Sequence, residues 1–409
     1  MGRKGAFCSY ISLVRRESSQ RKEACVARQG RPVKERAIHG TAIHGRAIHG
    51  RAIHGRAGHP PIEKRVVSRD MQAAISNRNK SVERWLVIVC LVIVSMVGVG
   101  GATRLTHSGL SMVEWKPIQG ILPPMNSAEW EEEFTRYKAF PEYQILNKGM
   151  SLDAFKRIFY WEYGHRVLGR VIGLLFFIPL VYFWFTKQIP LGFKGRLLIA
   201  LGLGGCQGLM GWYMVQSGLV DVPRVSHFRL AAHLSLALGI LGYLYWLLLD
   251  MRRVRKVNIS PAMRLGSRIL LVLLAFQIVY GAFTAGMRAG LGFNTYPMMG
   301  DAWLAEAATT LAPFWLNFFE NGAMIQFIHR WAAIAVALYA VAMLVTAIKS
   351  RAERRWRRAL GWVVVLIAIQ VILGIATLLN YVPLGLALVH QVMACFVLLG
   401  VLYLNRLAR

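Results

Sequence analysis

Long runs of apolar residues dominate the chain after residue 84. A run of about 18 or more apolar residues, without the spacing of an amphipathic helix, predicts a membrane span. We therefore predict an all-α polytopic membrane protein. Its eight spans are expected near Trp85–Thr103, Ile158–Phe185, Arg196–Val215, Ser226–Leu249, Leu265–Met287, Met324–Ile348, Trp362–Leu379 and Leu384–Leu404.

Basic residues alternate between the loops. Lys and Arg are frequent after the second, fourth and sixth predicted spans, whereas the loops after the third and fifth hold only Arg224 and Arg288, and the loop after the seventh holds none. Lys and Arg are retained on the cytoplasmic side of a membrane. The basic loops and both chain ends are therefore predicted to be cytoplasmic. The long loop Arg104–Arg157 is predicted to lie outside and to fold over the bundle.

The composition agrees with a membrane protein. Hydrophobic residues make up 55% of the 409 residues, and charged residues only 17%, against roughly a quarter in soluble domains. Much of the net charge of +29 lies in the first 84 residues and in short loops, so we predict no nucleic-acid partner. None of the five cysteines forms a CxxC pair, which argues against a disulfide framework and a zinc site.

Residues 1–84 read as a basic, low-complexity cytoplasmic tail. A repeated AIHG unit places histidines at a spacing of five: His39, His44, His49, His54 and His59. Such a tract can bind metal, but this spacing fits no helix face and no apolar residues accompany it, which favours disorder. The tail lacks the features of a secretory signal. Met71 would be a sensible true start, and the residues before it are expected to be dispensable.

The rest of the chain divides into two similar halves, residues 85–250 and 251–409. Four correspondences connect them: Gly100-x-x-Thr103 with Gly281-x-x-Thr284, Gln207-x-x-x-Gly211 with Gln370-x-x-x-Gly374, His165-Arg166 with His329-Arg330, and His233 with His390. Each half has four predicted spans, so both halves start on the same side. This predicts a parallel repeat of two four-helix bundles, related by an axis along the membrane normal.

Each even-numbered predicted span carries one histidine: His165, His233, His329 and His390. Each lies about five to eight residues into its span, which places all four roughly 10 Å below the outer surface. Ionisable residues inside a membrane are costly and usually functional. Two histidines per half, without Cys or Asp beside them, suit the two axial positions of a heme iron better than zinc, which needs three or four ligands.

Other residues near the histidines leave alternatives open. Glycines in the first three spans could make room for a planar macrocycle or simply allow close helix packing. Arg166 and Arg330 could pair with heme propionates or extend to the outer interface. Remaining candidates are interpreted as structural: His107 and His227 as surface residues, and Cys90, Cys206 and Cys395 as core packing.

The two halves differ at one informative position. Glu162 precedes His165 by one helical turn, on the same face, whereas Gln326 stands at the matching position before His329. A carboxylate in one half only suggests chemistry there and a supporting heme in the other half. The alternative is that Glu162 is solvated at the membrane interface.

Several motifs resemble the heme A synthase family, from about Arg84 to the end of the chain. They are the runs Gly100–Ser111, Glu114-Trp115-Lys116-Pro117, Gly120-x-x-Pro123-Pro124, Trp161-Glu162-x-Gly164-His165-Arg166, Gln207–Leu219 and Arg229–His233. The resemblance implies an eight-helix bundle of two halves that oxidises the methyl on pyrrole carbon 8 of heme O to a formyl group, giving heme A for cytochrome c oxidase. Some members of the family carry a cysteine pair in the first outer loop; this chain has none, which resembles the subtype of alphaproteobacteria and mitochondria.

The resemblance also implies roles and partners. His165 and His233 would bind the substrate heme, His329 and His390 a heme b cofactor, and Glu162 would act as proton relay or as stabiliser of a developing cation. Heme O is the implied substrate, with heme O synthase, cytochrome c oxidase assembly factors and membrane lipid as partners; a homo-oligomer is left open. The implied location is the cell inner membrane, or the mitochondrial inner membrane in a eukaryote. A diheme b-type electron-transfer cytochrome and a heme carrier remain alternatives, and neither requires Glu162.

Overall fold

The computed structural model describes residues 69–113, 122–218 and 224–408, with side chains from Lys80 onward. The predictions for the histidine repeat, Cys8, Cys25 and the Glu114-Trp115-Lys116-Pro117 motif therefore concern residues outside the described part. Within that part the secondary structure is helical, apart from a single isolated bridge between Met299 and Ala302.

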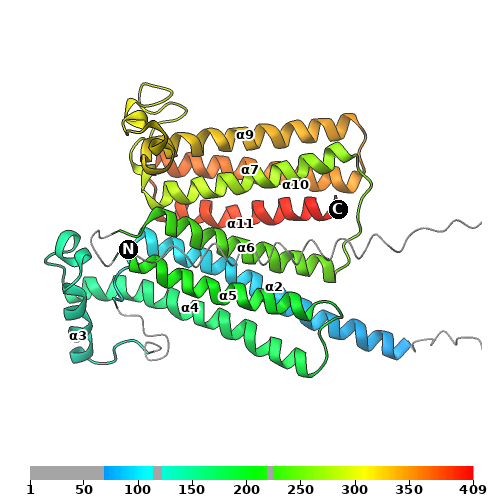
Figure 1. The fold of residues 1–409 in the computed structure, drawn as a ribbon, viewed down its shortest axis with the longest axis horizontal. Helices are drawn as coiled ribbons and strands as arrows, with labels where there is room; N and C mark the ends of the chain where they lie inside the picture. Colours follow the sequence, from blue (N-terminus) through cyan, green and yellow to red (C-terminus); the bar gives the residue numbers. More distant parts are fainter. Residues whose placement is uncertain (1–68, 114–121, 219–223, 409) are drawn as a thin grey trace, which may run out of the picture. The chain divides into compact units, whose positions relative to one another are not determined.

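Eight of the described helices are long and apolar enough to cross a membrane. They are α2 (Arg69–Leu105), α4 (Leu152–Phe185), α5 (Lys194–Gln216), α6 (His227–Met251), α7 (Pro261–Gly286), α9 (Gly322–Lys349), α10 (Arg354–Leu379) and α11 (Leu384–Leu407) (Figure 1). Large apolar side chains such as Phe177 and Leu209 are exposed on the outside of the bundle, as contact with lipid requires. The eight predicted spans are confirmed, and the protein is a multi-pass membrane protein.

Several spans begin earlier than hydropathy predicted, and α4 and α10 show the physical reason. Helix α4 starts at Leu152 instead of near Ile158, because Ser151 caps it by accepting a hydrogen bond from the backbone N–H of Ala154. Its first turns also pack Phe155 and Phe159 against Trp130 of helix α3 (Ser127–Lys138). Helix α10 starts at Arg354 instead of near Trp362, and its first turn buries Trp356 completely. In both cases packing extends the helix beyond the apolar run.

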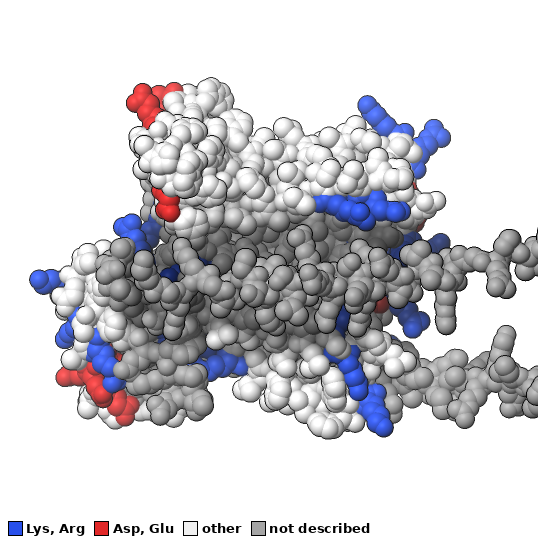
Figure 2. Space-filling model, in the orientation of Figure 1, with Lys and Arg blue, Asp and Glu red and all other residues white. Residues whose placement is uncertain are grey.

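The connections differ in size at the two ends of the bundle. One end, here called the loop end, carries the described residues of two long connections, 106–113 with 122–151, and 287–321 (Figure 1). These segments contain α3 and the short helices η2 (Glu142–Leu146), η3 (Ala289–Leu291), η4 (Glu306–Thr309), η5 (Phe314–Leu316) and α8 (Asn317–Glu320). The opposite end, here called the basic end, has the short connections after α4, α6 and α9, which are rich in Lys and Arg. Figure 2 shows Lys and Arg at both ends, with Asp and Glu beside them mainly at the loop end.

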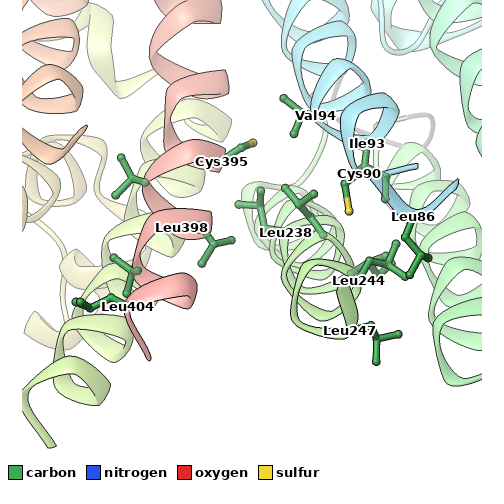
Figure 3. Close-up of a cluster of buried hydrophobic side chains, with 14 of the residues drawn as sticks. Leu86, Cys90, Ile93, Val94, Leu238, Leu244, Leu247, Cys395, Leu398 and Leu404 are labelled. Carbon is green, nitrogen blue, oxygen red and sulfur yellow. The ribbon is translucent and has the colours of Figure 1, made fainter. Parts of the chain in front are cut away.

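The centre of the bundle is packed by α2, α6 and α11 (Figure 3). Cys90 from α2, Leu244 from α6 and Leu398 from α11 belong to one continuous buried cluster. Cys90 and Cys395 are buried, as predicted. The prediction for Cys206 is wrong, because this residue lies on an exposed face of α5.

The helix contacts follow the same order in both halves. In the first half α2 packs on α4 and α6, and α5 packs on α6; in the second half α7 packs on α9 and α11, and α10 packs on α11. The halves meet through α6 against α7 and α11 against α2. The parallel repeat of two four-helix bundles stays a prediction.

Candidate active site

A cavity of about 810 Å³ lies among the helices of the first half. His165 from α4 and His233 from α6 both line it, together with Glu162. Its volume falls within the roughly 300–1,000 Å³ of ligand-binding pockets. The structure therefore places the two predicted ligands of the first half, and the predicted catalytic acid, around one space.

Each of the four histidine rings lies against a glycine of the preceding span. A Cβ added to these glycines would lie 3.1 Å from His165 Nε2 at Gly100, 3.2 Å from His233 Cε1 at Gly211, 3.0 Å from His329 Cε1 at Gly281 and 2.9 Å from His390 Cε1 at Gly374. These distances are shorter than carbon contacts normally are. The four glycines thus make room for the rings. By contrast, a Cβ at Gly164 or Gly173 would meet nothing within 4 Å.

Three of the four histidines are each contacted by a glutamine of their own. The side-chain nitrogens of Gln207, Gln277 and Gln370 lie 3.2, 3.0 and 3.3 Å from Nδ1 of His233, His329 and His390, and each also donates to the main-chain oxygen of that histidine. Each glutamine precedes its cradling glycine by four residues and so shares its helix face. The signal Gln-x-x-x-Gly was visible in the sequence at Gln277, although we noted it only at the other two positions.

His165 is held differently from the other three. Met96 stands four residues before Gly100, where the other cradles have glutamine, and it lines the cavity. Within the described part of the chain, the His165 ring makes no hydrogen bond. Its ring is therefore the least constrained of the four.

The second pair of histidines lies in the second half. His329 on α9 and His390 on α11 are close enough to interact electrostatically, and neither is among the residues that line the cavity. Gln391, directly after His390, does line the cavity, and its side chain donates to Val97 O on α2 at 2.7 Å. One residue of α11 thus connects the surroundings of the second pair to the cavity of the first.

Glu162 is buried, with 3% of its surface exposed. Its carboxylate accepts hydrogen bonds from Ser111 Oγ and Met112 N, both at 2.8 Å, and forms a salt bridge with Arg166 at 2.6 Å. The alternative of a solvated interface residue is therefore wrong. The sequence could not indicate Ser111 and Met112, because they reach Glu162 only through the path of the loop after α2.

The matching residues of the second half hold a loop in the same way. Arg166 Nη2 donates to Met112 O at 2.6 Å, and Arg330 Nη2 donates to Phe293 O at 2.6 Å. Gln326, at the position of Glu162, also donates to Phe293 O, at 3.1 Å. Both arginine side chains thus bind the loop-end backbone of their own half. Arg330 is buried, so it does not extend to the membrane interface.

A second acid lines the same cavity. Glu142, from the loop between α3 and α4, is 5% exposed and accepts a hydrogen bond from the Tyr137 hydroxyl at 3.1 Å. Burial raises the pKa of Glu142 to about 7; the charge of Glu162 acts in the same direction, and Tyr137 and Arg288 act against it. Seven acids lie in that loop, so its sequence did not distinguish Glu142.

Basic side chains line the cavity at the loop end. Arg104, His107, Arg224 and Arg288 all line it, and His107 Nδ1 accepts a hydrogen bond from Arg288. His107 is exposed, as predicted, but it belongs to this group. The surface prediction for His227 is wrong: its side chain is 13% exposed and hydrogen-bonds to Phe319 O at 2.8 Å, because α8 covers it.

Comparison with known proteins places this arrangement in a family. Residues 83–402 match the family model of cytochrome oxidase assembly proteins of the COX15-CtaA type. The chain belongs to this family. The match contains all four histidines and all or most of each of the eight spans.

Curated relatives agree over most of their length. The chain is 44% identical to a heme A synthase of Parvibaculum lavamentivorans over 80% of this chain and 94% of that protein. It is 46% identical to a heme A synthase of Azorhizobium caulinodans, over 78% of this chain and 92% of the relative. A heme A synthase of Nitrosospira multiformis is 43% identical over 80% of this chain and 93% of its own length.

Replacing Glu142 tests the buried acid in this family member. An acid whose pKa rises on folding, here from 4.5 to about 7, destabilises the fold progressively as the pH rises through that range. The Glu142→Gln side chain cannot ionise. The melting temperature of the variant minus that of the wild type should therefore increase between pH 4.5 and 7, and this difference should be constant above pH 7. The exposed Glu129→Gln serves as control. A melting difference that does not change with pH would contradict an ionisable buried Glu142.

Proposed function

We propose that this protein is a heme A synthase, which oxidises the carbon 8 methyl of heme O to a formyl group. The observation that carries the proposal is one cavity lined by two cradled histidines and a buried carboxylate, His165, His233 and Glu162. The relatives that bear this name support it over most of the chain.

The first site suits a heme substrate. His165 on α4 and His233 on α6 would hold the heme iron of the substrate through their imidazole nitrogens. The glycines around them leave the wall of the cavity free of side chains; a Cβ at Gly204, Gly205 or Gly208 would meet nothing within 4 Å. The less constrained ring of His165 suits a ligand that must release product and accept new substrate.

The second pair suits a resident heme b. His329 and His390 are cradled by glycines and contacted by Gln277 and Gln370, whose buried side-chain oxygens have no hydrogen-bond partner among the described residues. Contacts of this kind help to fix the orientation of the two imidazole rings. Heme b, when bound there, would supply one-electron redox chemistry.

The glycine cradle of the second pair gives a direct test. Gly374→Ala places a Cβ 2.9 Å from the His390 ring, so the ring must shift, and we expect heme retention at this pair to weaken by about 10- to 100-fold. Gly361→Ala on the same helix is the matched control, since its Cβ would meet nothing within 4 Å. Heme content per protein after purification measures the effect. Equal retention in the two variants would show that the cradle does not position the ligand.

Glu162 is the group that we assign to proton handling. Conversion of a methyl to a formyl group is a four-electron oxidation that needs an external oxidant. Its last step, loss of water from the diol, takes a proton from one hydroxyl and gives a proton to the other, which leaves as water. Ser111, Met112 and Arg166 hold the Glu162 carboxylate at the wall of the cavity. A positioned carboxylate of this kind can relay a proton or stabilise developing positive charge.

The proposed setting is the cell inner membrane, with the loop end facing away from the cytoplasm. The Lys- and Arg-rich connections at the basic end support this orientation. A diheme electron-transfer cytochrome is the second candidate, because two pairs of cradled histidines could serve electron transfer alone.

Identification of the bound pigments separates these functions. We expect protein purified from cells that make heme O to contain heme b together with heme O, a hydroxylated intermediate or heme A, as identified by the mass of the extracted hemes. Heme b alone in both sites would overturn the proposal and favour the electron-transfer cytochrome.

A further inference from the structure

Three guanidinium groups converge at the loop end of the cavity. Arg104 comes from the end of α2, Arg224 from the connection before α6, and Arg288 from the residue pair after α7. Arg224 and Arg288 also line a second, adjoining cavity of about 370 Å³. The three side chains thus approach one another from segments far apart in the sequence.

The positive charge of this group is poorly balanced. Among the described residues, none of the three arginines forms a salt bridge: Arg104 donates to the backbone oxygen of Ala285 at 2.5 Å, and Arg288 donates to His107. Burial and the neighbouring Arg224 lower the pKa of Arg288, and only Glu142 acts against this. Like charges held together in a partly buried site favour binding of an anion.

The group lies just outside the level of the histidine pair. Arg104 follows Gly100, the cradle of His165, by four residues, which is about 6 Å along the helix axis toward the loop end. A macrocycle held between His165 and His233 would therefore present one edge to the arginines. The opposite edge would face the apolar walls deeper in the bundle.

The substituents of heme determine which edge of the macrocycle would face the arginines. Both propionate side chains leave the macrocycle on one edge, and the carbon 8 methyl shares a pyrrole ring with one of them. The apolar hydroxyethylfarnesyl chain of heme O leaves from the far side of the macrocycle. Arg166 is not free for the propionates, because it holds Glu162 and Met112 O.

We propose that Arg104, Arg224 and Arg288 form the site for the propionate carboxylates of the substrate heme. Anchoring that edge at the loop end brings the pyrrole ring that carries the reactive methyl to the part of the cavity lined by Glu162 and Glu142. The three arginines then decide which methyl group is presented for oxidation. This inference rests on the proposed function for the identity of its ligand.

Binding of ferric protoheme and of its dimethyl ester to the full chain tests the site without turnover. Charge-assisted hydrogen bonds to carboxylates should make the wild type prefer the free acid by about 10- to 100-fold. In Arg104→Gln/Arg288→Gln this preference should disappear through weaker binding of the acid, with the ester unchanged. Arg229→Gln is the matched control, since Arg229 lies at the same end but stacks on Tyr213 outside the cavity lining.

Two results would overturn the inference. One is equal affinity of the wild type for acid and ester; the other is a double variant that weakens both alike while it keeps heme at His329 and His390, the sign that it has folded. Failure of the proposed function looks different. A protein that prefers the free acid but forms no heme A from heme O would retain the carboxylate site and lose only the proposed oxidation.

Discussion

Glu162→Gln is expected to keep the fold and both hemes but to lose about 10²–10⁴ of the rate of heme A formation, the usual contribution of a positioned proton-transfer group. The amide is nearly isosteric with the carboxylate. Gln326 occupies the equivalent place in the second half and donates to Phe293 O there, so this position of the scaffold accommodates an amide. Arg166 keeps its own bond to Met112 O in the variant, and the loop stays anchored.

Heme A formed per mole of bound heme b is the measurement that isolates this effect, because it corrects for any loss of folded protein. Glu129→Gln, which removes an exposed acid from the same loop end, should show full turnover. If Glu162→Gln also turned over near the wild-type rate, Glu162 would be only an anchor for the loop that holds Ser111 and Met112. The oxidation would then rely on the hemes alone.

Loss of a histidine ligand should have an equally large effect, and one that differs between the pairs. His329→Ala and His390→Ala are expected to remove the resident heme b, whereas His165→Ala and His233→Ala are expected mainly to disturb the substrate heme. The reason is spatial: the first pair lines the cavity of about 810 Å³, and the second pair does not. Absorbance spectra and extracted hemes of the purified variants measure both outcomes.

Cys206→Ala is the control for this series, since Cys206 lies on an exposed face of α5 and outside the cavity lining. It should retain both hemes. The same pattern of heme loss from all four ligand variants would argue for one shared site and against two separate pairs.

Much of the architecture could be predicted from the sequence because a lipid bilayer restricts the backbone to few structures. Backbone groups inside a bilayer must be satisfied within their own helix, so a long apolar run is a helix, and all eight spans were predicted. Their ends were less certain where packing extends a helix beyond its apolar run. Phe155 and Phe159 lengthen α4 by packing on α3, a contact that hydropathy does not register.

Some features of the candidate site could likewise be read from the sequence, and others depended on helix packing. The four histidines and the contrast between Glu162 and Gln326 were readable from sequence alone, because an ionisable group within an apolar run is costly and therefore conspicuous. Which glycines cradle the rings depended on helix packing: a Cβ at Gly100 would meet His165, while a Cβ at Gly164 would meet nothing.

Only the tertiary structure brought the loop residues into the site. Ser111, Glu142 and Arg288 lie in polar segments, where charged and hydroxyl side chains are ordinary and carry no periodic signal. Their approach to the cavity depends on how the loops fold back over the ends of the helices. The sequence by itself thus determined the spans and the ligands within them, while the partners of Glu162 and the arginines at the cavity were decided by contacts between segments far apart in the chain.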